Sequence, residues 1–308
     1  MSRAVFVDCP SFLAALYSTE LEAIVPDLAV NVGDPSEDEV VALLEGRVAA
    51  LNDHCYMPAR LLEACPGLKI IVFMGTGASS YVDVAAAERL GIRVRTFRGY
   101  GDRSIAEHAL ALMFAAGRQI AAMDRGVRAG DWRVLDGIEF AGKTLGVVGT
   151  GGVGREMARL GHALGMEVIA WNRSGVSDDL PCAPCALDDL LARADVVSLH
   201  LALGEQTRGI IDARCIGLMK PSAILVNTAR GALVDEAALV EALRAGRIRH
   251  AALDVFDDEP LAADHPMAGL DNVTLSAHAA FMTAEASKRM WRMALEILRD
   301  ELAALAER

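Results

Sequence analysis

The loop Gly149-Thr150-Gly151-Gly152-Val153-Gly154 carries the strongest indication of fold in this chain. They follow the apolar run Leu145–Val148 and precede a helical pattern. In such a loop the first glycine permits a tight turn, the second lets the backbone approach a pyrophosphate, and the third lets helix and strand pack closely. Free N–H groups at the helix start also attract phosphate. Because a strand precedes the loop and a helix follows it, the loop predicts a dinucleotide-binding site. Its expected contacts are Gly149, Gly151, Gly152, Val153 and Gly154.

The second half of the chain alternates short apolar runs with helical patterns. The apolar runs are continuous, as in strands that a parallel sheet buries on both faces. The runs are Leu145–Val148, Val168–Trp171, Val196–Leu199, Ala223–Asn227, Ala251–Asp254 and Val273–Ser276, and helices are expected at Glu156–Leu164 and Asp235–Ala245. This alternation predicts a doubly wound α/β domain of the Rossmann type over residues 99–283.

The first hundred residues repeat the pattern more weakly. Strands are expected at Val5–Asp8, Ala49–Asn52, Ile70–Met74 and Ile92–Thr96, with helices at Asp38–Leu44 and Asp83–Leu90. We interpret this part as a smaller, flavodoxin-like substrate domain, with Ser104–Arg118 as a helix that connects it to the second domain. The last helix, from about Thr283, is expected to fold back, so that the substrate domain comprises residues 1–98 and 284–308.

The composition of the chain excludes several classes of protein. Hydrophobic residues make up 53% of the 308 positions and charged residues 23%, which is typical of a globular protein. The net charge of −12 disfavours binding to a phosphate backbone, so no nucleic-acid partner is expected. No apolar stretch approaches the roughly 20 residues of a membrane span, and the N-terminus lacks the pattern of a signal peptide. We therefore expect a cytoplasmic protein with no membrane partner.

The pair Cys182-Ala-Pro-Cys185 has the spacing of a redox motif or of half a zinc site. No second cysteine pair or histidine cluster completes a set of four ligands. We therefore expect no metal site and six reduced thiols, as is usual inside the cell.

The strand Val168–Trp171 ends at Asn172-Arg173-Ser174, where many dinucleotide sites hold the adenosine ribose with an acidic residue. An asparagine can still bind the ribose, but it does not repel a 2′-phosphate. Arg173 and Ser174 could contact such a phosphate. A solvated turn is the alternative, because Asp178 and Asp179 are close by. The pattern slightly favours NADP over NAD.

Three further strand ends carry polar residues that suit hydride transfer to a 2-keto acid. Arg230 follows one strand, Glu259 lies beyond the next, and His278 follows the last. The histidine is the natural proton donor at neutral pH. A neighbouring carboxylate favours the protonated imidazole and orients it, a role for Glu259. Arg230 offers a planar, two-pronged donor to the carboxylate and carbonyl of the substrate.

The sequence resembles the family of D-isomer-specific 2-hydroxyacid dehydrogenases, close to glyoxylate and hydroxypyruvate reductases. The matching stretches are Gly149–Gly154, Asn227–Asp235, Leu253–Pro260, Asn272–His278, Gly75-Thr76-Gly77 with Asp83, and Ala106-Glu107-His108. They run through almost the whole chain in the order of the family. One departure is Ala277, which stands where the family has a proline before the catalytic histidine.

The resemblance implies a role for each matching residue. Arg230, Glu259 and His278 would be the catalytic set, with His278 as the proton donor. Asp254 would bind the nicotinamide carboxamide, and Thr228 would lie near the same ring. Backbone N–H groups around Gly75, Thr76 and Gly77 would hold the substrate carboxylate. The family is usually dimeric, so a homodimer that involves the region beginning at Ser104–Arg118 is expected.

The expected activity is reduction of small 2-keto acids to D-2-hydroxy acids with NADH or NADPH. Glyoxylate, hydroxypyruvate and pyruvate are the candidate substrates. One alternative is a non-enzymatic nucleotide sensor on the same fold. Another is a dehydrogenase of a phosphorylated hydroxyacid, for which Arg98 and Arg103 are candidate phosphate ligands.

Overall fold

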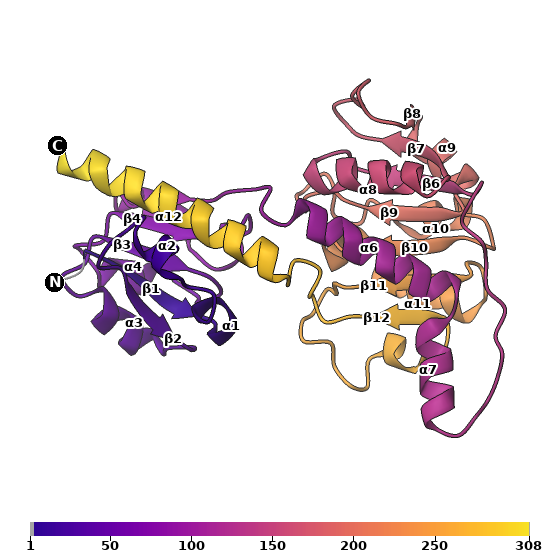
Figure 1. Ribbon diagram of the computed structural model, residues 1–308, viewed down its shortest axis with the longest axis horizontal. Coiled ribbons are helices and arrows are strands. Elements are labelled where there is room, and N and C mark those ends of the chain that lie inside the picture. The colour runs from indigo at the N-terminus through magenta and orange to yellow at the C-terminus, as the bar shows by residue number, and fades with distance from the viewer. Residues whose placement is uncertain (1–2, 308) are drawn as a thin grey trace. The chain divides into compact units, whose positions relative to one another are not determined.

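The computed structural model describes residues 3–307, which form two compact units (Figure 1). Unit 1 comprises the chain up to Gly101 together with the chain from Met282 onward, and unit 2 comprises Asp102–Phe281. Each unit is a parallel sheet between layers of helices. The expectation of two doubly wound α/β domains is therefore confirmed.

The sheet of unit 2 has seven strands in the order β12-β11-β10-β9-β6-β7-β8, all parallel. The strands are β6 Thr144–Val148, β7 Glu167–Trp171, β8 Ala183–Pro184, β9 Val196–Leu199, β10 Ile224–Asn227, β11 His250–Leu253 and β12 Val273–Leu275. The chain turns outward in both directions from β6, which is the order of a Rossmann fold. The crevice between β6 and β9 is therefore the place where such sheets bind nucleotides.

Helices cover both faces of this sheet. They are α6 Asp102–Gly117, α8 Gly152–Ala163, α9 Leu187–Arg193, α10 Ala213–Leu218 and α11 Glu236–Arg244, with 3-10 turns η2 Gly231–Leu233 and η3 Pro266–Gly269. The helix α7 Ile120–Arg128 follows α6 and has no buried residue. Alternate residues of β6 point to opposite faces: Val147 packs with α6 and α8, whereas Val148 packs with α9, α10 and α11. The strands are buried on both faces for this reason, which explains their continuous apolar sequences.

Unit 1 has a five-stranded parallel sheet in the order β2-β1-β3-β4-β5, as in flavodoxin. Its strands are β1 Ala4–Cys9, β2 Ala29–Val32, β3 Ala49–Asn52, β4 Ile70–Phe73 and β5 Arg93–Arg95. Its helices are α1 Ser11–Ala14, α2 Thr19–Glu22, α3 Glu37–Leu44, α4 Ala59–Glu63, α5 Val84–Arg89 and α12 Ala284–Ala306, with the 3-10 turn η1 Ala78–Ser80.

The last helix, α12, completes one apolar face of unit 1. Trp291 is fully buried against Phe6 and Tyr17, with ring centroids 5.2 and 4.8 Å away. Its indole N–H donates to the carbonyl oxygen of Leu13 at 2.9 Å. Unit 1 is therefore built from two stretches of chain that are distant in sequence.

Two strands and one helix differ from the sequence-based expectations. The short strands β2 and β8 carry no continuous apolar run and were not expected. Both lie at sheet edges, where burial selects fewer apolar residues. The helix expected to connect the domains is α6, and it packs inside unit 2 through Ala109, Met113 and Ala116, which are fully buried.

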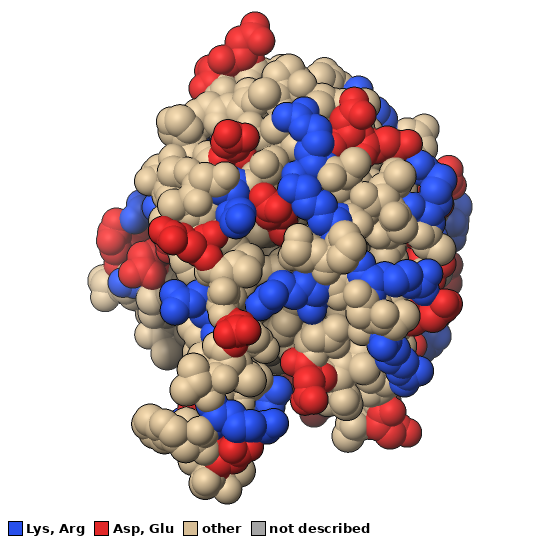
Figure 2. Space-filling model, turned by 90° about the vertical axis from the view of Figure 1, so that its right-hand side faces the viewer, with Lys and Arg blue, Asp and Glu red and all other residues tan. Residues whose placement is uncertain are grey.

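The face drawn in Figure 2 carries charges of both signs. On the face drawn in Figure 2, lysine and arginine side chains lie among aspartate and glutamate side chains. Within residues 3–307, no helix is both long enough and apolar enough to cross a bilayer. All six cysteines are free, and burial raises the pKa of the Cys182 and Cys185 thiols.

Candidate active site

The glycine loop joins β6 to α8 at the carboxyl edge of the large sheet. Gly149 has φ +96°, and a Cβ there would lie 2.7 Å from the carbonyl oxygen of His200 at the end of β9. A Cβ on Gly154 would collide with the carbonyl oxygen of Gly149, so helix and strand meet at that point. A Cβ on Gly151 would face open space. Gly151 is the N-cap residue of α8, so no side chain caps the first N–H groups of this helix. The open side at Gly151 fits a pyrophosphate held by the helix N-terminus.

The end of β7 is tied to this loop by Asn172. Its side-chain oxygen accepts from the Thr150 N–H at 3.3 Å, and its amide nitrogen donates to Ser174 Oγ at 2.8 Å. Arg173 and Ser174 are exposed, and the Arg173 guanidinium donates to the side chain of Gln206. Asn172 therefore orders the turn, while the two residues after it face solvent where the adenosine ribose is expected.

Thr228 follows β10 at the same edge of the sheet. Its side chain is buried, and its hydroxyl oxygen has no hydrogen-bond partner among the described residues. A buried polar atom without a partner costs free energy unless a bound group satisfies it. The hydroxyl therefore fits the expected place beside the nicotinamide ring.

The turn that carries Arg230 lies close to the loop after β11, because Gly231 has no side chain between them. A Cβ on Gly231 would collide with the backbone of Phe256 and Asp257. The exposed Arg230 guanidinium donates to the carbonyl oxygen of Ala229 at 2.6 Å. The close approach brings the Arg230 turn beside the loop that carries Glu259.

Glu259 and His278 form a direct pair. Glu259 Oε2 lies 2.6 Å from His278 Nδ1, and Glu259 Oε1 accepts from the Phe256 N–H at 2.9 Å. The imidazole side chain is 41% exposed. The carboxylate orients the ring through Nδ1, so Nε2 is the nitrogen that can exchange a proton with a ligand.

The Asp254 side chain is buried and hydrogen-bonded within the protein. Its side chain is 0% exposed, and its carboxylate accepts from Ser276 Oγ at 2.6 Å and from the N–H groups of Ala279 and Ala280 at 3.0 and 2.9 Å. Burial alone would raise the pKa of this carboxyl, but hydrogen bonds from His108, Ser276 and the two N–H groups lower it overall. The expected contact with the nicotinamide carboxamide stays a prediction.

Two polar residues at this site, His108 and Ser276, had no role predicted from the sequence. His108 Nε2 lies 3.0 Å from Ser276 Oγ and 3.3 Å from Asp254 Oδ1. Both residues occur in stretches that match the family, so a signal existed. The sequence match did not indicate a role, because the contact between His108 and Ser276 joins α6 to the end of β12, and these elements are distant in sequence.

The Gly75-Thr76-Gly77 loop belongs to unit 1 and follows β4. Gly75 has φ +155°, and its N–H donates to the carbonyl oxygen of Phe73 at 2.8 Å. That N–H is already used, which argues against Gly75 as a donor to a carboxylate. Thr76 is exposed and Gly77 is half-buried, and their N–H groups remain the candidates.

Comparison with known proteins identifies the family. The model "D-isomer specific 2-hydroxyacid dehydrogenase, NAD binding domain" matches residues 110–280, more than half of the chain. Glyoxylate reductase of Aeropyrum pernix is 42% identical over 250 residues, 77% of this chain and 74% of the relative. Hydroxypyruvate reductase of Thermotoga maritima is 37% identical over 290 residues, 92% of this chain and 94% of the relative.

Two further similarities bear on the substrate and the cofactor. D-3-phosphoglycerate dehydrogenase of Mycobacterium leprae is 42% identical over 306 residues, which are 96% of this chain but only 58% of the relative. The structure of an acyclic imino acid reductase in complex with NADPH and D-Arg superposes with a TM-score of 0.84 at 29% identity. That alignment covers 98% of this chain and 97% of the other.

The glycine loop, the buried Thr228 hydroxyl and the His278–Glu259 pair lie at one sheet edge and define an NAD(P)-dependent oxidoreductase. The family model and the relatives refine this class. The chain belongs to the family of D-isomer specific 2-hydroxyacid dehydrogenases and has 2-hydroxyacid dehydrogenase activity.

Proposed function

We propose that this enzyme reduces small 2-keto acids of the glyoxylate, hydroxypyruvate or pyruvate class to D-2-hydroxy acids, with His278 as the proton donor. The observation that carries the proposal is the 2.6 Å contact between Glu259 and His278, with Nε2 of the exposed imidazole left for the substrate. The nicotinamide cofactor supplies the hydride when it is bound. His278 gives a proton to the carbonyl oxygen, which gains negative charge as the hydride arrives.

The other residues of the proposed site bind and orient. Arg230 holds the substrate carboxylate and carbonyl through its guanidinium, whose planar shape suits two parallel hydrogen bonds. The N–H groups of Thr76 and Gly77 are proposed donors to the same carboxylate. Gly151, Gly152 and Val153 hold the pyrophosphate, and Thr228 and Asp254 stay the proposed contacts of the nicotinamide.

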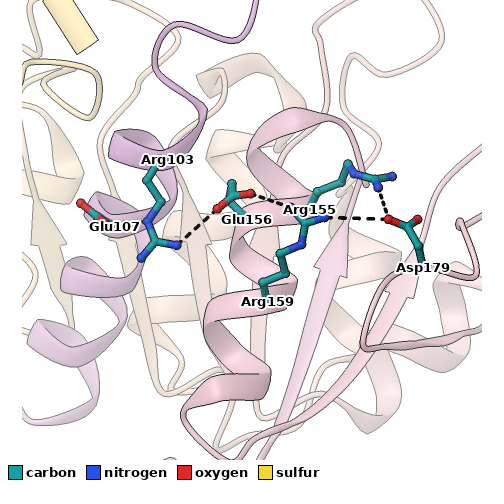
Figure 3. Close-up of polar contacts among 6 residues, drawn as sticks. All are labelled: Arg103, Glu107, Arg155, Glu156, Arg159 and Asp179. Atoms are coloured by element: carbon teal, nitrogen blue, oxygen red, sulfur yellow. Dashed lines mark hydrogen bonds and ion pairs between the residues drawn. The ribbon is translucent and has the colours of Figure 1, made fainter. Parts of the chain in front are cut away.

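NADP is the preferred cofactor in this proposal, and NAD is the alternative. At the end of β7, Asn172 is uncharged and Arg173 and Ser174 are exposed, which suits a 2′-phosphate. The nearby carboxylate of Asp179 is paired with Arg155 and Arg159, as Figure 3 shows, so its charge is offset. The similar imino acid reductase structure holds NADPH, which supports the same preference.

The similarity to a phosphoglycerate dehydrogenase keeps a phosphorylated hydroxyacid as the second candidate substrate. The structure argues against one of its candidate ligands. Arg103 donates to Glu107 at 2.7 Å and to Glu156 at 3.3 Å, so two carboxylates already share its guanidinium (Figure 3). Arg98 is exposed and remains available to this alternative. The intact His278–Glu259 pair offers no support for a non-enzymatic sensor.

The test measures oxidation of NADPH and NADH by absorbance with glyoxylate, hydroxypyruvate, pyruvate and 3-phosphohydroxypyruvate. We expect turnover with the unphosphorylated acids, and a loss of about 10²- to 10⁴-fold in kcat for His278→Ala. His162→Ala, on the exposed face of α8, is the matched control. Turnover that survives in His278→Ala would refute the proton-donor role, and activity with the phosphorylated acid alone would favour the second candidate.

The cofactor preference has its own test. Arg173→Ala is expected to raise KM for NADPH by about tenfold and to leave KM for NADH nearly unchanged, because a charged hydrogen bond contributes about 1.5–3 kcal/mol. Asn172→Asp is expected to shift the preference toward NADH. Equal effects on the two cofactors would show that the turn does not contact a 2′-phosphate.

We also propose a homodimer and a cytoplasmic location. The free cysteines suit a reducing compartment.

A further inference from the structure

We propose that His108 is a positioning residue for the turn that carries His278, and that it acts through Ser276 and Asp254. The inference rests on the proposed role of His278 as proton donor. His108 lies on α6, 168 residues before Ser276 in the sequence. Its Nε2 contacts the Ser276 hydroxyl, two residues before His278.

The three residues form a chain of hydrogen bonds with one consistent direction. The Ser276 hydroxyl donates its hydrogen to Asp254 Oδ1 at 2.6 Å. The Ser276 oxygen therefore accepts from His108 Nε2 at 3.0 Å, which requires the hydrogen of a neutral ring to be on Nε2. The same nitrogen lies 3.3 Å from Asp254 Oδ1.

The far end of the chain is the backbone of the catalytic turn. The Asp254 carboxylate accepts the N–H groups of Ala279 and Ala280, and the Asp254 carbonyl oxygen accepts the His278 N–H at 2.7 Å. His278 has φ +48°, in the left-handed region that a non-glycine residue adopts only when its surroundings hold it there. Asp254 thus holds the turn at three consecutive N–H groups.

Asp254 can hold the turn only while hydrogen bonds stabilise the negative charge of its carboxylate. Its side chain is 0% exposed, and a buried carboxylate that lacks hydrogen-bond donors is strongly destabilised. Three of the donors near the Asp254 carboxylate belong to residues 276–280. His108 adds a donor from a distant helix, with Nε2 near both Ser276 Oγ and Asp254 Oδ1. Its loss would leave the Ser276 oxygen without that donor and let Asp254 and the turn relax.

Relaxation of the turn would displace the imidazole of His278 and would leave in place the glycine loop, Thr228 and Arg230, which bind cofactor and substrate in the proposed site. A displacement of about 1 Å can cost about 10²-fold in rate. We therefore expect an effect on kcat rather than on KM.

The experiment compares four variants with the wild-type enzyme. His108→Leu removes the donor, His108→Gln replaces it with an amide nitrogen at a similar position, and Ser276→Ala breaks the chain one residue later. His162→Leu makes the same change on the exposed face of α8 and is the control. We expect His108→Leu and Ser276→Ala to lower kcat by about 10- to 100-fold, with KM and the Kd for NADPH within about twofold. His108→Gln should recover most of the rate, and the control should match the wild type.

A second readout does not depend on any activity. The ring signals of His278 in ¹H–¹³C NMR spectra, assigned with His278→Gln, should move in His108→Leu and stay near their wild-type positions in His108→Gln. Unmoved signals, an unchanged kcat, or a raised Kd for NADPH at an unchanged kcat would each overturn the inference. If the wild-type enzyme reduced no keto acid, the proposed function would fail, and the NMR comparison would still decide whether His108 positions the turn.

Discussion

Glu259 holds its histidine from a fixed place because its carboxylate serves two groups at once. One oxygen accepts from the Phe256 N–H at 2.9 Å and the other lies 2.6 Å from His278 Nδ1. A side chain that is anchored at one oxygen cannot rotate away from the imidazole. The pair therefore sets the orientation of the ring.

Glu259→Gln tests this pair at the residue scale. The amide keeps the size of the side chain but removes the negative charge beside the imidazole, so we expect kcat to fall by roughly 10²-fold with a smaller change in KM. Steady-state kinetics with the preferred keto acid is the measurement. Wild-type kcat in this variant would mean that the carboxylate is not needed for proton donation.

Two buried histidines make stability depend on pH. Burial lowers the pKa of His250 and of His200 from 6.5 to about 4, and His250 Nε2 lies 2.9 Å from Thr274 Oγ1. Between pH 6.5 and about 4 the unfolded chain binds protons that the folded protein does not. The free energy of unfolding should therefore be highest above pH 6.5 and fall as the pH decreases, by up to about 3 kcal/mol for His250.

Urea unfolding at pH 7.5 and at pH 5 measures this effect. His250→Gln, which can keep a hydrogen bond to Thr274, should lose less stability between the two pH values than the wild type. His162→Gln, an exposed control, should behave as the wild type does. Equal losses in the wild type and in His250→Gln would contradict the assignment.

At the scale of elements, every side chain of the proposed site in unit 2 except His108 follows the carboxyl end of a parallel strand. β6 leads into the glycine loop, β10 into Thr228 and Arg230, β11 into Asp254 and Glu259, and β12 into His278. Parallel strands end at the same sheet edge, so residues from 149 to 278 meet there without any local contact in sequence.

The glycine loop offers a matched pair of variants at this scale. Gly154→Ala places a Cβ against the Gly149 carbonyl oxygen, so we expect it to destabilise the unit by about 1–3 kcal/mol. Gly151→Asp adds a side chain where nothing lies within 4 Å, so stability should be nearly unchanged. The same change puts a carboxylate where the pyrophosphate is expected, so NADPH binding should be lost. Thermal unfolding and NADPH fluorescence titration separate the two effects, and a strongly destabilised Gly151→Asp would contradict this account.

At the scale of the whole molecule, the chain presents apolar side chains that a single copy leaves in water. α7 has no buried residue, and Ile120 and Val127 on it are about half exposed. In the segment that follows, Trp132 is 84% and Val134 is 88% exposed. Large apolar side chains that gather in one stretch mark an interaction surface. They support the proposed homodimer.

Trp132→Asp with Val134→Asp tests the homodimer. The two carboxylates would be buried in the proposed interface, so we expect monomers at micromolar concentrations, measured by sedimentation velocity. The paired change Arg128→Asp with Asp124→Arg, within an exposed ion pair on α7, is a control that keeps the apolar side chains. A wild-type protein that sediments as a monomer would refute the homodimer.

The sequence alone was enough to predict the classes of both units, and it also indicated the residues of the proposed catalytic set. Continuous apolar runs indicate strands buried on both faces, and the glycine spacing has few uses other than binding a dinucleotide, so local patterns sufficed. The sequence did not predict the edge strands β2 and β8, because a strand at a sheet edge needs no continuous apolar run.

The tertiary structure was needed to show which partners the polar groups of the proposed site have. Asp254 is a strand-end carboxylate like Glu259 in the sequence, yet its side chain is buried and accepts hydrogen bonds from Ser276 and the turn after it. Likewise the Gly75 N–H donates to the Phe73 carbonyl oxygen, and His108 on a distant helix contacts Ser276. The direction of a side chain and the partners of its polar atoms depend on packing between segments far apart in the chain, and no local pattern of residues encodes them.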